Sequence, residues 1–279
     1  METNLLSVLE HGAEAVESRR NALAFVGKLA GGAVLSMLPF GLAKEAQAQS
    51  AGDDVAILNY ALTLEYLEGS FYNQYVTDAV ITNAAVRPLF ATIKADEAKH
   101  VAFLSGALRA AGATPVAFTN ADFDFTAGGM FTPTDYQTFL ILSQGFEDTG
   151  VRAYKGQAPN FSNTTNGKAY LTAALNIHSV EARHAAAVRK VRGLQGWIPG
   201  DGTDLGAAQA IRGSYQGGQV RRGVTDPSPS ESNVTQGGVT IAPTSRYTLE
   251  QIQEAFDEPF GTATVKNIVD PFVIPDLGA

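Results

Sequence analysis

Glutamate is followed three residues later by histidine at two places in the chain, Glu97–His100 and Glu181–His184. On a helix, residues three apart lie on the same face, so each pair would direct a carboxylate and an imidazole into one volume. Oxygen and imidazole nitrogen are ligands that suit iron, manganese or zinc. The two pairs therefore point to metal binding.

Two further glutamates, Glu65 and Glu147, lie like the first two within apolar helical stripes. A buried carboxylate without a partner is strongly disfavoured, but two divalent ions would neutralise four of them while both imidazoles bind in the neutral form. We therefore predict a dinuclear site with the ligands Glu65, Glu97, His100, Glu147, Glu181 and His184. The motif glutamates would bridge the ions, and the lone glutamates would bind one ion each. The alternative is a bundle that keeps these residues but binds metal poorly.

Four helices must position these side chains. Apolar residues recur at steps of three and four, as on the inward face of a helix, over residues 54–76, 84–111, 133–156 and 167–191. The first and third links are short, whereas residues 112–133 form a long, aromatic connection. This predicts an all-α antiparallel four-helix bundle with a long crossover between helices two and three.

The first two predicted helices and the last two carry matching motifs, so the two helix pairs look like related halves. Tyr72 follows Glu65 by seven residues, and Tyr154 follows Glu147 by the same distance. These tyrosines are either hydrogen-bond partners of ligand carboxylates or core residues whose hydroxyls are satisfied elsewhere.

Other charged residues lie close to the predicted ligands. Glu68 is an alternative or supplementary carboxylate on the first helix, and His178 either supports the ligand network or is simply packed. Asp148 lies off the apolar stripe, and Asp96 and Lys99 do so as well, so all three are predicted at the solvated surface.

The composition of the chain argues against several classes of function. The 279 residues carry a formal charge of −8, which gives no electrostatic support for nucleic-acid binding. The chain has no cysteine, which excludes disulfides, thiolate metal sites and a cysteine nucleophile. No pattern of repeated membrane spans stands out, so we expect no integral membrane domain in the mature chain.

The N-terminal residues are typical of an export signal. Arg19 and Arg20 precede a mildly apolar stretch, and Ala46-Gln47-Ala48 fits a signal-peptidase site. We predict a twin-arginine-like signal over residues 1–48 and a periplasmic or extracellular location. A general secretory signal or an uncleaved anchor is the alternative.

The C-terminal part differs from the bundle in composition. The bundle is assigned to residues 49–199, and a Gly-rich, largely irregular extension to residues 200–279. A short helix is expected after Thr248, which forms a capping pair with Gln251. The apolar end is expected to pack along the bundle, although a partner contact or a lid is an alternative.

The motifs Leu64-Glu65-Tyr66-Leu67-Glu68, Asp96-Glu97-Ala98-Lys99-His100, Phe146-Glu147-Asp148-Thr149-Gly150-Val151 and Glu181-Ala182-Arg183-His184 carry a family resemblance. They resemble the ferritin-like domain of exported bacterial proteins and plant desiccation-related proteins. More distantly, the ligand order is similar to that of ferritins, bacterioferritins, rubrerythrins and manganese catalases. The resemblance covers about residues 54–195 and implies a ferritin-like bundle with two iron or manganese ions. The Gly-rich extension departs from storage ferritins.

The resemblance does not specify a reaction. An enzyme of ferroxidase, peroxidase or manganese-catalase type would act on a small oxidant or a metal ion. The second hypothesis is a non-enzymatic envelope protein that protects or scaffolds under oxidative or desiccation stress, with a structural or vestigial metal site. Iron storage would need a closed shell of many subunits. A homo-oligomer of another size is a further alternative.

Overall fold

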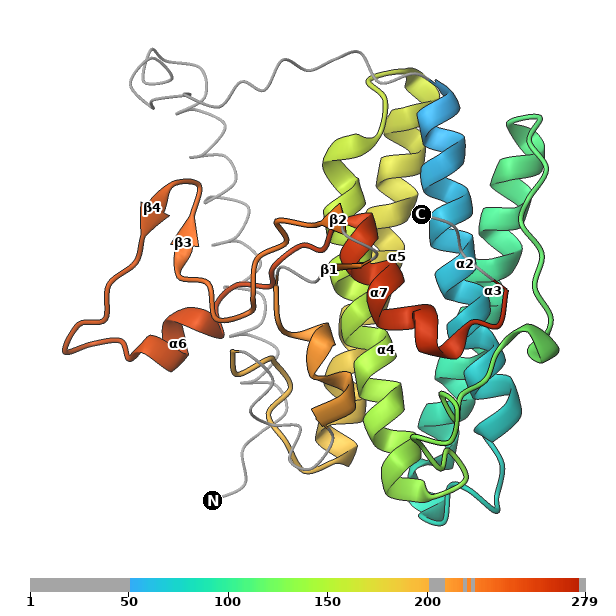
Figure 1. Ribbon diagram of the computed structural model, residues 1–279, viewed down its shortest axis with the longest axis horizontal. Coiled ribbons are helices and arrows are strands. Elements are labelled where there is room, and N and C mark those ends of the chain that lie inside the picture. Colours follow the sequence, from blue (N-terminus) through green and yellow to red (C-terminus); the bar gives the residue numbers. More distant parts are fainter. Residues whose placement is uncertain (1–50, 201–208, 218–219, 222–223, 276–279) are drawn as a thin grey trace, which may run out of the picture. The chain divides into compact units, whose positions relative to one another are not determined.

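A computed structural model of the chain describes residues 51–200, 209–217, 220–221 and 224–275. Its main elements are four long helices, α2 (Ala51–Tyr75), α3 (Arg87–Ala110), α4 (Tyr136–Gln157) and α5 (Thr165–Val191) (Figure 1). α2 packs on α3 and α4 packs on α5, and the two pairs meet where α2 contacts both α4 and α5. The predicted all-α four-helix bundle is confirmed. The predicted export signal lies outside the described residues.

Local sequence determines where the helices begin. The Asp135 side chain accepts a hydrogen bond from the Thr138 backbone amide at 2.8 Å, which caps α4. Thr164 caps α5 in the same way, through the amide of Gly167 at 3.0 Å. A 3₁₀ turn over Ala84–Val86 leads into α3, which has a proline in its first turn, and a second 3₁₀ turn over Ala158–Asn160 follows α4.

The long crossover between α3 and α4 packs against the bundle. It contains a 3₁₀ turn, Asn120–Asp122, and two buried aromatic rings, Phe123 and Phe125. Phe123 forms an antiparallel β-bridge with Val273, and Phe272 lies with its ring centroid 5.0 Å from that of Phe146 on α4. The apolar segment near the C-terminus therefore packs along the bundle and the crossover together.

The C-terminal extension is largely irregular, as predicted, but it contains more short elements than the single helix expected after Thr248. They are a 3₁₀ segment (Gln209–Ser214), β1 (Val220–Arg221), β2 (Val224–Thr225), β3 (Thr235–Gln236), β4 (Val239–Thr240), α6 (Leu249–Gln253), α7 (Thr262–Val269) and a 3₁₀ turn (Asp270–Phe272). β1–β2 and β3–β4 are antiparallel hairpins. Gly237 and Gly238 turn the second hairpin with φ angles of 58° and 81°, which favour glycine. The Thr248–Gln251 capping box opens α6.

Two buried arginines attach the extension to the outer side of the bundle. Arg152 on α4 is fully buried, pairs with Glu231 at 2.8 Å and donates hydrogen bonds to the backbone carbonyls of Ser214, Pro229 and Glu258. Its guanidinium also lies over the Phe260 ring. The extension thus supplies most of the partners of this arginine.

The second arginine corrects one prediction. Asp148 was expected at the solvated surface, but it is 2% exposed and pairs with Arg189 of α5. Tyr215 of the extension donates a hydrogen bond to the same carboxylate at 2.5 Å. The prediction was wrong because the extension covers the face of α4 that points away from the bundle.

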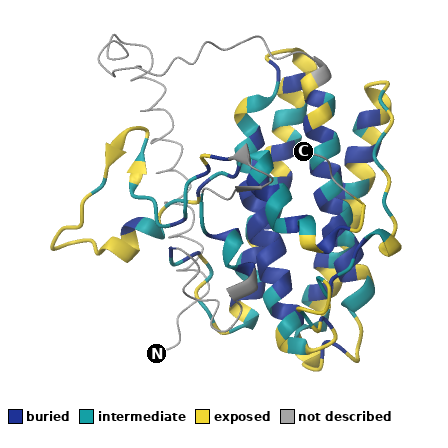
Figure 2. Cartoon of the chain, in the orientation of Figure 1, coloured by how far each residue is buried: buried dark blue, intermediate teal, exposed yellow. Residues whose placement is uncertain are grey.

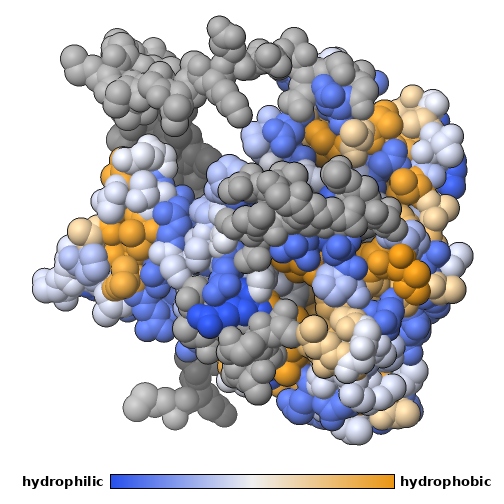
Figure 3. Space-filling model, in the orientation of Figure 1, coloured by the Kyte–Doolittle hydropathy of each residue, from blue (hydrophilic) through white to orange (hydrophobic). Residues whose placement is uncertain are grey.

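Burial follows this arrangement (Figure 2). From Phe139 to Tyr154, every residue of α4 except Ile141 is buried. On the face that Figure 3 draws, hydrophobic residues are interspersed with hydrophilic ones. Among the described helices, none has the length and apolar character needed to span a membrane.

Candidate metal centre

Six polar side chains converge in the bundle interior. All four helices contribute, because each places a glutamate in its inward stripe and two add a histidine one turn further on. The structure brings all six predicted ligands together: Glu65 from α2, Glu97 and His100 from α3, Glu147 from α4, and Glu181 and His184 from α5. The four glutamates are 0% exposed, and both histidines are buried almost as deeply. Such burial of four carboxyl groups requires either compensating positive charge or protonation.

The six side chains form two overlapping groups, each able to hold a metal ion. One group contains Glu65, Glu97, His100 and Glu181, and the other contains Glu97, Glu147, Glu181 and His184, with the ligand atoms of each group within 4.8 Å of one another. Glu97 and Glu181 belong to both groups. The geometry thus separates two shared carboxylates from two terminal Glu–His pairs.

Three carboxylate oxygens surround one nitrogen of His100. Its Nδ1 lies 3.1 Å from Glu65 Oε2 and 3.2 Å from both Glu97 Oε2 and Glu181 Oε1. One N–H group can donate to only one of these oxygens with good geometry. The arrangement is that of ligand atoms directed at a common point.

The second group shows the same convergence more strongly. His184 Nδ1 lies 3.0 Å from Glu97 Oε1 and 3.3 Å from Glu147 Oε2. Yet these three atoms and both carboxylate oxygens of Glu181 are buried without a properly directed hydrogen bond among the described residues. Buried polar atoms rarely lack a partner, and a cation between these atoms would supply one to each. The residues present therefore fit a bound metal.

The charges also perturb one another. Burial raises the pKa of Glu181 well above its ordinary value, and the charges of Glu97 and Glu65 raise it further. Burial raises the pKa of Glu97 and of Glu147 as well. Although burial alone would lower the pKa of His184, the adjacent carboxylate of Glu147 raises it to about 11. Without a cation, the cluster therefore holds protons.

Two tyrosines bind carboxylates of the opposite half of the chain. Tyr72 on α2 donates a hydrogen bond to Glu147 Oε1 at 2.5 Å, and Tyr154 on α4 donates one to Glu65 Oε1. Of the two predicted roles, hydrogen bonding to a ligand carboxylate is the one that the structure favours, because each hydroxyl is bonded to a terminal carboxylate of the cluster. These bonds fix one oxygen of Glu65 and one of Glu147 and leave the other oxygen directed inward.

Glu68 adds a fifth carboxyl group to the interior. It is 3% exposed and belongs to neither group of four. Burial and the charges of Glu181 and Glu147 raise its pKa well above the ordinary value, which favours the protonated form. Gly150 gives it room, because a Cβ atom there would lie 3.1 Å from Glu68 Oε1. From the sequence, this glycine was given no role. Its position one turn after Glu147 on α4 could have indicated one.

Three neighbouring residues differ in their relation to the cluster. Asp96 was expected at the surface, but its side chain is only 27% exposed and its Oδ2 lies 3.4 Å from His184 Nε2. This contact can orient the imidazole, a role that sequence analysis missed. Lys99 is exposed and pairs with Asp96. His178 contacts the backbone carbonyl of Val151 at 3.0 Å, so it is packed in the bundle.

Comparison with known protein families agrees with this fold. A family model described as the ferritin-like domain matches residues 53–194, which is half of the chain. The chain belongs to the ferritin-like family. A search among curated proteins found no match.

Proposed function

We propose that the protein binds two ions of iron or manganese and uses them to react with dioxygen, peroxide or ferrous iron. The overlap of the two ligand groups at Glu97 and Glu181 carries the proposal. When bound, two such ions can each exchange one electron, so that an oxidant takes up two electrons in one encounter. Glu65 and His100 would hold one ion, and Glu147 and His184 the other.

The surrounding residues would hold these ligands in place. Tyr72 and Tyr154 each bind one oxygen of a terminal carboxylate, so the other oxygen would be left to bind an ion. Asp96 contacts the outer nitrogen of His184, which leaves Nδ1 directed at the cluster.

Metal analysis of the full chain, purified from its native compartment, tests the proposal. We expect two equivalents of one metal per chain in the wild type and none in a Glu97→Ala/His100→Ala variant. The loaded protein should turn over hydrogen peroxide or ferrous iron. A wild-type chain without metal would refute the proposal, and loaded protein without turnover would favour the non-enzymatic stress-protection role.

We also propose that the protein is exported, by the twin-arginine route. Support comes from Arg19 and Arg20 and the apolar stretch after them. Replacement of both arginines by lysine should retain the protein in the cytoplasm, as measured by cell fractionation. Unchanged export of that variant would exclude this route.

A further inference from the structure

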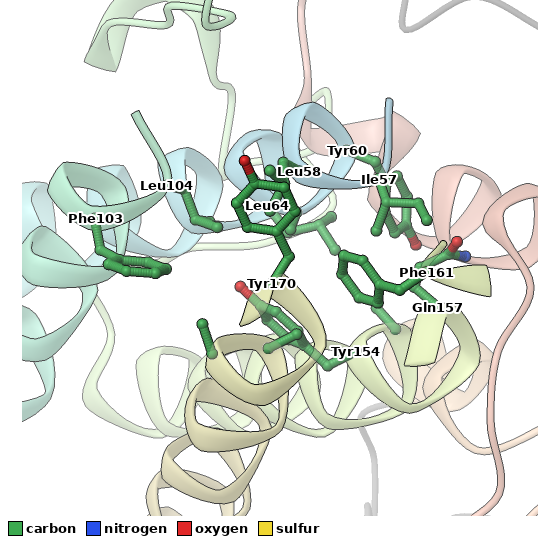
Figure 4. Close-up of a pocket in the computed structure, with 14 residues that line it drawn as sticks. Ile57, Leu58, Tyr60, Leu64, Phe103, Leu104, Tyr154, Gln157, Phe161 and Tyr170 are labelled. Atoms are coloured by element: carbon green, nitrogen blue, oxygen red, sulfur yellow. The ribbon is translucent and has the colours of Figure 1, made fainter. Parts of the chain in front are cut away.

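An apolar pocket lies between α2, α3, α4 and α5 at one end of the bundle (Figure 4). Leu58, Leu64, Leu104 and Ala174 line it, and carbon atoms make up almost all of its accessible surface. The closed part of the pocket is small, on the scale of a single water-sized molecule.

The pocket lies next to the candidate metal centre. Leu104 follows His100 by one turn of α3, and Ala61 precedes Glu65 by one turn of α2, which corresponds to about 5.4 Å along each helix. Tyr154 joins the two, because it lines the pocket while its hydroxyl binds Glu65. A molecule in the pocket is therefore separated from the carboxylates by a single layer of side chains.

The pocket also reaches the protein surface. Phe103 is 47% exposed, and Phe161 and Tyr170 are half-buried, so three aromatic rings from different parts of the chain border its outer end. Figure 4 shows these rings around the pocket together with Tyr154. Rotation of exposed aromatic side chains is fast, so the outer end can open without movement of the helices.

The lining selects by polarity. Transfer of an ion into such surroundings is strongly unfavourable, and a molecule that needs hydrogen bonds would find no partners for them there. Dioxygen is small, neutral and apolar, so it loses almost nothing. We propose that the apolar pocket admits dioxygen, rather than ions or peroxide, to the metal pair; this rests on the proposed function.

Xenon tests the pocket independently of metal. Xenon is apolar and occupies dry cavities, so crystals of the full chain under xenon pressure should show one atom among Leu58, Leu104 and Ala174. Ala174→Leu should abolish this site, whereas Ala169→Leu, at an exposed position of the same helix, should keep it. A wild-type pocket without xenon would overturn the inference.

Oxidation kinetics test the route. In protein loaded anaerobically with ferrous iron, Ala174→Val and Ala174→Leu should slow oxidation by dioxygen in order of added volume. We expect about tenfold for leucine, which corresponds to about 1.4 kcal/mol in barrier height. Oxidation by peroxide and the metal content should not change, and Ala169→Leu should behave as wild type.

Three controls keep these outcomes distinct. Circular dichroism and melting temperature show whether each variant folds, and the valine variant adds too little volume to unfold the bundle. Equal dioxygen rates in Ala174→Leu and Ala169→Leu, or equal slowing with peroxide, would overturn the inference. A wild-type chain that binds no metal would instead refute the proposed function, and the xenon result would still stand.

Discussion

Replacement of Glu181 by glutamine should stabilise the metal-free protein while it removes the response to metal. Glu181 is 0% exposed, both of its carboxylate oxygens lack a properly directed hydrogen bond among the described residues, and it belongs to both ligand groups. Glutamine has nearly the same shape but no charge. The substitution therefore separates the cost of a buried carboxylate from the benefit of the cation that it would bind.

The magnitude follows from the charge. To neutralise a carboxyl group with an ordinary pKa of 4.5 at pH 7 requires about 3.4 kcal/mol. This is the upper limit of what Glu181→Gln can recover without metal, and it corresponds to a rise of about 7–14 °C in melting temperature. In the wild type, one metal ion at 100 times its Kd adds about 2.7 kcal/mol, or about 5–11 °C.

Calorimetric melting of the full chain at pH 7, with chelator and then with manganese, measures both effects. We expect the metal-free variant to melt higher than the metal-free wild type and to gain nothing from manganese. Glu250→Gln, at an exposed position of α6, should change neither value. If Glu181→Gln melted lower without metal and kept the manganese response, the reasoning would be refuted.

The other predictions concern stoichiometry, protons and the extension. Glu65→Gln should leave one metal equivalent and Glu97→Gln none, because Glu65 belongs to one group whereas Glu97 is shared by both; metal analysis decides. Because the pKa of His184 is raised to about 11, this imidazole is protonated in metal-free protein at pH 7. Metal binding must release that proton and must therefore weaken as the pH falls. Calorimetry in two buffers of different ionisation enthalpy counts the released protons, and a heat of binding that did not depend on the buffer would contradict this prediction. Arg152→Met should cost about 3–5 kcal/mol in urea unfolding because it leaves Glu231 buried and unpaired; adding Glu231→Gln should restore part of that stability, and a merely additive loss would argue against the pairing.

The bundle could be predicted from sequence because its signal is local. Apolar steps of three and four fix the inward face of each helix, and Glu65, Glu97 and Glu181 lie in phase with those steps. The same phase explains why the candidate ligands converge in the structure. The long aromatic crossover was recognisable for a related reason, since rings such as Phe123 and Phe125 need a core to pack against.

What sequence reasoning missed depends on contacts between distant parts of the chain. Asp148 reads as a surface residue until Arg189 and Tyr215 are brought to it from 41 and 67 residues away. Asp96 likewise becomes relevant only when α5 presents His184 to it, 88 residues further on. The helix α7 begins after Gly261, which has no capping side chain, so the sequence carries no signal for the start of this helix. Neither spacing nor composition encodes these long-range contacts.

The enclosure of α4 limits how copies of this chain can assemble. The bundle covers one side of this helix, and the extension covers the other through Arg152 and Tyr215. Gly156 shows how close the cover lies, because a Cβ atom there would overlap the Phe260 carbonyl oxygen at 1.8 Å. Along the buried stretch from Phe139 to Tyr154, a neighbouring subunit could therefore pack on α4 only if the extension first moved away.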